Sequence, residues 1–197
     1  KVILLPDPDV NAQSGYRFAP EFKTSEILLN TNVAERFAVR FIEAIAPFHS
    51  LNVAYDDVTG MTLDGMQLDF ASGSPLGPTR RYSAPSKESL HIVLCSLAIS
   101  GNTRARLFLS PQSPSNAVSI ARELLAKKIA TLERFDSENP GFGGFLPWFV
   151  LGEGRITPAY DWVNKVPFLD IGQMAWALFY AESVLREVGA TALAGRV

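Results

Sequence analysis

The sequence predicts an all-α fold built from αα-hairpins, and two observations support this. Apolar residues recur at three- and four-residue spacing in four segments, near 24–46, 84–100, 113–135 and 170–188. They form one stripe in the first and third segments but surround the second and fourth. Because a helix that is apolar on all sides is wrapped by neighbours, outer and inner helices should alternate, as in a helical toroid or a solenoid. No repeat of fixed period is present, so the solenoid is the weaker alternative.

The expected helix ends carry residues that commonly stop or start helices. Pro47 stops the first helix, and Gly101 and Gly189 end the second and fourth. The third begins with Ser113 as a capping residue and Pro114 at the first helical position. Its apolar stripe is Val118, Ala121, Leu125, Ile129 and Leu132. The charged residues expected in water on this helix are Glu123, Lys127, Lys128, Glu133 and Arg134.

Length and composition are typical of one globular domain, which we expect to span residues 1–197, with 47% hydrophobic and 19% charged residues. A net charge of −2 and the lack of a Lys/Arg cluster argue against nucleic acid as a partner. The longest apolar stretches fall short of the roughly 20 residues that cross a bilayer, so no membrane partner is expected.

Two features of the sequence bear on the cellular compartment. The first ten residues, "KVILLPDPDV", hold too few apolar residues before Pro6 for a signal peptide, so an export signal has been removed or never existed. The single cysteine, Cys95, lies among apolar neighbours and is expected to be a core thiol. We expect a secreted or extracytoplasmic protein.

Two connections, 47–83 and 136–169, are far longer than usual, and loops beyond about 15 residues are commonly functional. Since outer helices run one way and inner helices return, both connections should lie at the same end of the fold. That end is where we expect an active cleft.

The first connection contains four aspartates at spacings that do not match a calcium-binding loop, so we interpret them as turn residues. They are Asp56, Asp57, Asp64 and Asp69.

The second connection contains "NPGFGGFLPWF", whose glycines permit tight turns that present aromatic rings. The rings in question are Phe142, Phe145, Trp148 and Phe149. Sugar rings stack well on such faces, although packing at the end of the fold is an equally good explanation for each ring alone.

Three carboxylates are candidates for acid–base chemistry, which in glycoside hydrolysis normally needs a pair of them. Asp170 begins an inner helix, whose dipole stabilises an ionised carboxylate and so suits a base or a hydroxyl ligand better than an acid. Glu88 lies in the first turn of the other inner helix, and Asp161 precedes Asp170 in the connection. His49 and His91 have no further ligand at metal-binding spacing, so no metal site is expected.

Four segments resemble, in the same order, parts of the endo-β-1,2-glucanases first known from fungi. They are "TGMTLDGMQLD", "SAPSKESLHI", "NPGFGGFLPWF" and "DWVNKVPFLDIGQMAWAL". The resemblance implies an (α/α)6 toroid of six αα-hairpins and internal hydrolysis of linear β-1,2-glucan by an inverting mechanism without metal or cofactor. One departure is Ile171, where the family commonly has Asn, which puts one sugar contact in doubt.

Four helices make two hairpins, so the resemblance also implies that this chain forms only part of the ring. The rest would come from missing sequence, which would supply the general acid and base, and the catalytic residues are therefore unknown. The chain would contribute sugar subsites with Phe145, Trp148 and Trp162 as stacking platforms. The expected hydroxyl ligands are Lys87, Asp161, Asn164, Lys165, Asp170 and Gln173.

Two other functions remain open. One is a non-catalytic module that binds carbohydrate or a partner through the same surface. The other is a related transglycosylase or phosphorylase, which differs chiefly in what replaces the attacking water.

Overall fold

The computed structural model describes residues 15–16, 19–69, 71–72 and 75–197. The chain divides into an N-terminal unit, Lys1–Pro47, and a main unit, Phe48–Val197. Each is described by itself, and the expectation of a single domain stays a prediction. The first ten residues, on which the expectation about an export signal rests, lie outside the described part.

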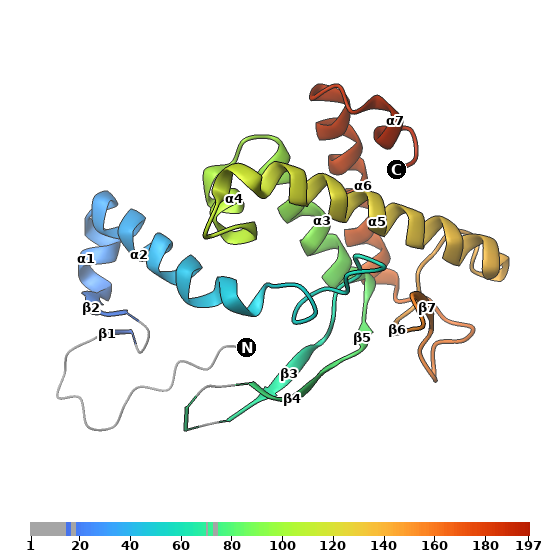
Figure 1. Ribbon diagram of the computed structural model, residues 1–197, viewed down its shortest axis with the longest axis horizontal. Coiled ribbons are helices and arrows are strands. Elements are labelled where there is room, and N and C mark those ends of the chain that lie inside the picture. Colours follow the sequence, from blue (N-terminus) through green and yellow to red (C-terminus); the bar gives the residue numbers. More distant parts are fainter. Residues whose placement is uncertain (1–14, 17–18, 70, 73–74) are drawn as a thin grey trace. The chain divides into compact units, whose positions relative to one another are not determined.

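The N-terminal unit contains two short strands followed by two helices (Figure 1). Strands β1 (Gly15–Tyr16) and β2 (Ala19–Lys23) pair antiparallel. The helix expected over 24–46 is broken into α1 (Thr24–Leu29) and α2 (Thr31–Ile45). The break lies at Asn30, whose backbone is extended and whose side chain accepts hydrogen bonds from the first N–H groups of α2. Helix α2 ends before Pro47, as predicted.

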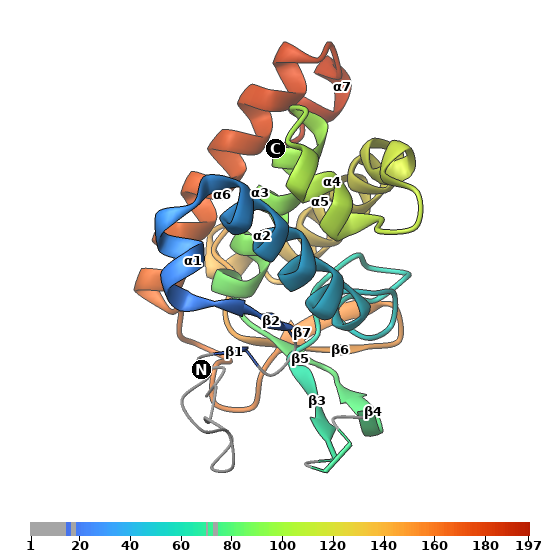
Figure 2. The same ribbon diagram turned by 90° about the vertical axis from the view of Figure 1, so that its left-hand side faces the viewer.

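The main unit is built around helix α3 (Pro85–Ile99), which packs against three other helices (Figures 1 and 2). These are α4 (Thr103–Leu109), α5 (Ala117–Glu138) and α6 (Phe168–Glu187), with α3 and α6 making the most extensive contact. The short helix α7 (Thr191–Ala194) packs against α6. Single-turn 3-10 helices lie at Ala46–Phe48, Pro114–Asn116 and Pro140–Phe142. Helices α3 and α6 confirm the predicted positions, and α4 was not predicted. Helix α5 confirms the third predicted helix, but its predicted start is wrong: Pro114 opens a 3-10 turn, Ser113 makes no side-chain capping hydrogen bond, and α5 begins only at Ala117.

Strands in the long connections correct the all-α expectation. Strands β3 (Gly65–Leu68) and β4 (Pro75–Arg80) form an antiparallel hairpin in the first connection. Strand β5 (Tyr82–Ser83) pairs with β6 (Phe149–Gly152), which in turn pairs with β7 (Arg155–Pro158). Because β5 belongs to the first connection and β6 and β7 to the second, the two connections meet at one end of the fold. That part of the prediction is confirmed.

A small apolar cluster fastens this end to helix α5. It combines residues of both connections with one from the helix: Met61, Leu63, Phe135, Leu146, Phe149, Leu151 and Ile156. Phe149 is fully buried in it, so this ring is not presented to solvent by the glycines that precede it. Phe142 packs against the same cluster.

Helix α6 is covered on one face only within the main unit. Met174, Ala177 and Leu185 are buried against the core, whereas Trp176 is 74% exposed and Phe179 is 63% exposed. The sequence predicted neighbours on all sides of this helix, and the main unit alone does not supply them. Among the described helices none is long and apolar enough by itself to cross a membrane, and only α3 and α4 taken together, bent by 118° at their break, reach that length and hydropathy.

Candidate functional site

The candidate site lies where the N-terminal ends of α3 and α6 meet the second connection. Asp170, in the first turn of α6, is half-buried, and its Oδ2 atom accepts two hydrogen bonds. The indole N–H of Trp148 donates one at 2.9 Å, and the hydroxyl of Ser86, in the first turn of α3, donates the other at 3.1 Å. The site therefore joins two helices and the segment before β6 through one carboxylate oxygen.

An aromatic wall stands beside this carboxylate. Trp148 and Trp162 stack with ring centroids 4.7 Å apart and an interplanar angle of 27°. Tyr82 meets Trp148 edge-to-face at 6.1 Å, and the guanidinium of Arg80 lies 5.3 Å from the Tyr82 ring centroid. Since the two tryptophans cover each other on one side, each offers at most one face to a ligand.

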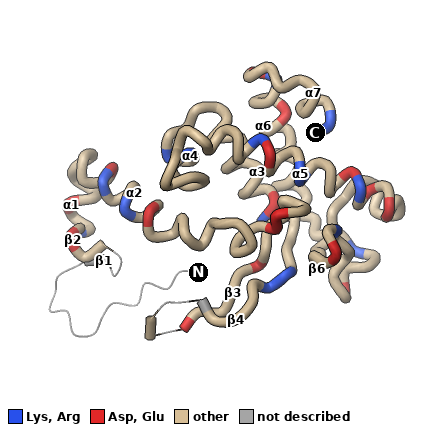
Figure 3. Tube along the Cα trace, viewed as in Figure 1, with Lys and Arg blue, Asp and Glu red and all other residues tan. Residues whose placement is uncertain are grey.

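Charged residues border the aromatic wall. Lys87 and Arg80 both pair with Asp64, Arg80 at 3.2 Å. The pKa of Lys87 is lowered because the ammonium is partly buried. The negative charges of Asp170 and Glu88 act in the opposite direction but do not outweigh burial. Asp64, which we expected to be only a turn residue, therefore also holds Lys87 beside the site. Figure 3 shows basic and acidic residues interspersed along both units.

Glu88, a catalytic candidate from the sequence, is fully buried. One carboxylate oxygen accepts hydrogen bonds from the backbone N–H and the hydroxyl of Thr62 at 2.7 and 2.6 Å, and the other accepts from Lys128 at 2.5 Å. Lys128 was expected in water but is 1% exposed. In the main unit Glu88 therefore holds α3, α5 and the first connection together and presents no surface to a substrate.

A hollow of about 500 Å³, lined in part by the residues that directly follow Trp162, gathers three predicted sugar ligands. Phe145, Asn164 and Lys165 line it, together with Asn139, Gly141, Phe142, Val163 and Val166. Phe145 is 52% exposed, and Asn164 and Lys165 are also exposed. This mixture of ring faces, amides and one ammonium is suited to a polar, hydroxyl-rich ligand.

The remaining predicted ligands are exposed and more loosely placed. Asp161 is close enough to Tyr82 for its charge to add to the burial that raises the pKa of the phenol. Gln173 is exposed on α6. In the described ranges, no group of three or more His, Cys, Asp or Glu side chains is arranged to hold a metal ion.

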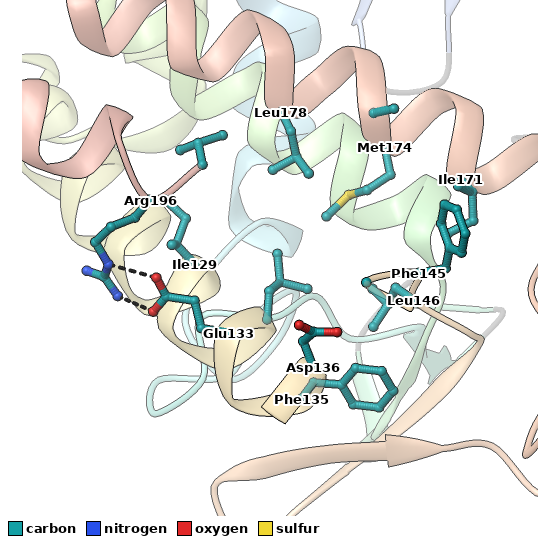
Figure 4. Close-up of a pocket in the computed structure, with 14 residues that line it drawn as sticks. Ile129, Glu133, Phe135, Asp136, Phe145, Leu146, Ile171, Met174, Leu178 and Arg196 are labelled. Carbon is teal, nitrogen blue, oxygen red and sulfur yellow. Dashed lines mark hydrogen bonds and ion pairs between the residues drawn. The ribbon is translucent and has the colours of Figure 1, made fainter. Parts of the chain in front are cut away.

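A second hollow of about 330 Å³ lies between α5 and α6 and is mostly apolar. Figure 4 shows the ion pair of Glu133 and Arg196 at one side and Phe145 with Ile171 at the other. Because Ile171 stands where an amide was expected from the resemblance, this side of the site offers an apolar surface rather than a hydrogen-bonding group.

Sequence reasoning missed three residues of the site. Ser86 and Tyr82 lie in the "RRYSAPSKES" segment and were not considered. Arg80 precedes them on β4. A polar side chain in the first turn of an inner helix, as at Asp170, was the signal that could have identified Ser86.

Comparisons with known proteins identify a family and two similar structures. The profile of the family described as endo-β-1,2-glucanase SGL matches residues 61–196. The structure is similar to that of the endo-β-1,2-glucanase from Talaromyces funiculosus in complex with sophorose, with 35% identity, a TM-score of 0.82, and coverage of 89% of this chain and 35% of that one. It is also similar to a glutamate-to-glutamine mutant of that enzyme in complex with β-1,2-glucan, with 35% identity, a TM-score of 0.84, and coverage of 93% and 37%.

The chain thus spans little more than a third of the solved enzymes. No protein of curated function matches the sequence. The family match covers more than half of the chain and includes residues 61–83 of the first connection, the whole second connection, α3, α5 and α6. The chain therefore belongs to the endo-β-1,2-glucanase SGL family.

Proposed function

We propose that this chain supplies part of the cleft of a glycoside hydrolase that cleaves linear β-1,2-glucan internally by an inverting acid–base mechanism. The observation that carries the proposal is the arrangement of Asp170, Trp148 and Trp162 at the joined ends of α3 and α6, within the segment that matches the family. The relatives from Talaromyces funiculosus were solved with sophorose and with β-1,2-glucan, which supports the same class of ligand here.

The finer architecture we propose is an (α/α)6 toroid, of which this chain forms part. Helices α3 and α6 would be neighbouring inner helices, and α5 an outer one. The support is the extensive α3–α6 contact and the apolar face of α6 that the main unit leaves uncovered. Burying Trp176 and Phe179 against a further helix would stabilise the ring by roughly 25 cal/mol for each Å² of apolar surface removed from water. Further sequence would complete the ring.

Sugar binding would use both kinds of surface in the site. Trp162 and Phe145 provide apolar ring faces for the C–H groups of glucose, and Asp170 accepts hydrogen bonds from its hydroxyls. Asn164, Lys165 and Lys87 donate to sugar oxygens. Asp161 and Gln173, both exposed nearby, would bind hydroxyls of adjoining units.

An inverting reaction requires an acid and a base about 6.5–9.5 Å apart, with a water between the base and the anomeric carbon. Asp170 already accepts two hydrogen bonds at one oxygen, which suits it to a role as a ligand or base that accepts from a sugar hydroxyl or water rather than to the role of acid. Glu88 has no access to substrate in the main unit. We therefore place the general acid and base in the remainder of the ring. The mechanism needs neither metal nor cofactor.

The test is incubation of the purified protein with linear β-1,2-glucan, followed by chromatography of chain length and NMR of the first products. We expect rapid shortening of the polymer and products that appear first as the α-anomer. An unchanged polymer that still binds would instead identify a carbohydrate-binding module. Products that form only with added phosphate or an acceptor sugar would identify a phosphorylase or transglycosylase.

The proposed location follows from the proposed substrate. A polymeric glucan is too large for ready uptake, so its internal cleavage is expected outside the cytoplasm. Fractionation of the producing cells, with the protein followed by antibody, tests a secreted or extracytoplasmic location.

A further inference from the structure

We propose that Trp148 and Ser86 are positioning residues that present the carboxylate of Asp170 to the glucan, and that the sugar stacks on Trp162 rather than on Trp148. This inference rests on the proposed function. It changes the role of Trp148 from a platform to a hydrogen-bond donor acting through another residue.

The hydrogen bonds to Asp170 are one-sided. Trp148 and Ser86 both donate to Oδ2, at 2.9 and 3.1 Å. In the described ranges no hydrogen bond to the other oxygen, Oδ1, is found. Nor is Oδ1 one of the buried polar atoms that lack a partner. A carboxylate fixed by two donors at one oxygen keeps its plane, while its second oxygen stays free to accept from a ligand. Asp170 is thus oriented before any sugar arrives.

The two donors are themselves held by the fold. Trp148 lies between Pro147 and Phe149, which are both fully buried, and its carbonyl accepts a hydrogen bond of 2.8 Å from the N–H of Ala159. Ser86 follows Pro85, also fully buried, at the start of α3. Because both donors are anchored by buried backbone neighbours, they have little freedom to follow Asp170, and instead Asp170 follows them.

The ring of Trp148 is poorly available for stacking. Trp162 lies against it at 4.7 Å, and Tyr82 meets it edge-to-face. Trp162 belongs to an irregular segment with exposed neighbours, Asp161 and Val163. The ring that can offer an open face is therefore that of Trp162, with Trp148 as its support.

A double-mutant cycle in the full-length protein tests this inference. Trp148→Phe keeps an aromatic ring but removes the indole N–H, and Asp170→Asn keeps the shape but removes the charge. Affinity for β-1,2-gluco-oligosaccharides is measured by calorimetry. We expect each single variant to bind roughly tenfold more weakly, as for loss of one charge-assisted hydrogen bond. The double variant should bind no more weakly than Asp170→Asn alone, because Trp148 acts through Asp170.

Controls separate positioning from general damage. Ser86→Ala should also be non-additive with Asp170→Asn, whereas Trp162→Ala should be additive with it. Trp176→Phe is the matched control: it makes the same change in a tryptophan of α6 that lies outside the site, and it should leave the affinity unchanged. Additive losses from Trp148→Phe and Asp170→Asn would overturn the positioning role while leaving the proposed function in place. A parent protein that binds no β-1,2-glucan would overturn both.

A measurement without sugar tests the geometry directly. The NMR resonance of the Trp148 indole N–H should move upfield in Asp170→Asn, because the hydrogen bond to a carboxylate is replaced by one to a neutral amide or lost. An unchanged resonance would show that Trp148 does not bond Asp170 in solution and would overturn the inference.

Discussion

The ammonium of Lys128 and the carboxylate of Glu88 meet at 2.5 Å inside the main unit, where their side chains are 1% and 0% exposed. This ion pair joins α5 to the first turn of α3, the turn that also carries Ser86 and Lys87. A buried pair is costly to break, because the remaining charge loses both water and its partner. The ends of the helices at the candidate site therefore depend on an interaction that no sugar touches.

Lys128→Met should lower the free energy of unfolding by about 3–5 kcal/mol, since it leaves Glu88 charged and unpaired in the interior. Adding Glu88→Gln should recover part of that loss, because Gln is neutral and its oxygen can still accept the hydrogen bonds from Thr62. Urea denaturation of both variants measures the difference. A double variant that is less stable than Lys128→Met would contradict this account.

Gly60→Ala should be more destabilising than Gly189→Ala. Both glycines have positive φ, +68° and +75°, so both substitutions carry similar backbone strain of about 1 kcal/mol. A Cβ on Gly60 would lie 2.9 Å from the Cβ of Lys127 and 3.1 Å from the carbonyl of Leu124, whereas a Cβ on Gly189 meets nothing within 4 Å. We expect the close approach to α5 to add about 1–3 kcal/mol in Gly60→Ala. Equal thermal shifts for the two variants would argue against it.

Acid should destabilise the main unit through His49 and His91, whose rings lie 4.8 Å apart beside Tyr55 and near the charge of Lys128. Burial lowers the pKa of His49 from 6.5 to about 4 and lowers that of His91 as well. The unfolded chain therefore takes up protons at a higher pH than the folded one. The free energy of unfolding therefore loses nothing to these histidines above pH 6.5. It falls as the pH drops toward 4, by about 3 kcal/mol for His49.

The variant that tests this dependence is His49→Phe, which keeps an aromatic ring in contact with Tyr55 and Phe108 but cannot take up a proton. Urea unfolding at several pH values should show a shallower loss of stability toward acid than in the parent. A slope equal to that of the parent would remove His49 as a source of the acid sensitivity.

Trp162→Ala should weaken oligosaccharide binding roughly tenfold with little loss of stability, since its ring is at the edge of the aromatic wall. Trp176→Ala should do the reverse in the full-length protein. Its ring is 74% exposed in this chain but is proposed to pack against a further helix. Calorimetry and thermal denaturation of the two variants give the comparison. Weaker binding from both would mean that the site and the uncovered face of α6 are not separate surfaces.

Helix positions were predictable because apolar periodicity is local. The same periodicity continues across Asn30, so it concealed the break that this capping residue makes between α1 and α2. Helix α4 has only seven residues, which is too short to show a period, although Asn102 caps it by accepting a hydrogen bond from Ala105. The capping residue Asn102 was therefore the one local feature from which the start of α4 could have been predicted.

Strands and buried pairs were not predictable in the same way, because their partners are distant in sequence. Tyr82 pairs with Val150, and neither has a local pattern that names the other. Lys128 falls on the charged side of a simple helical pattern and is buried only because Glu88 and the first connection lie over it. Asp170 could be identified as a candidate because it lies at the start of a helix. Its hydrogen bond with Trp148 could be found only from the three-dimensional structure. The roles of these residues toward a sugar stay predictions.

The small sheet of β5, β6 and β7 couples the movements of the two long connections. Tyr82 and Ser83 are hydrogen-bonded to the strand that follows Trp148, so one connection cannot shift without carrying the other. If a glucan chain displaced Trp162 and Trp148, the shift would pass through this sheet to the segment that carries Lys87, the partner of Asp64. Binding at one sugar position of the proposed cleft should therefore affect binding at the next, and affinity should grow with oligosaccharide length more steeply than independent positions allow.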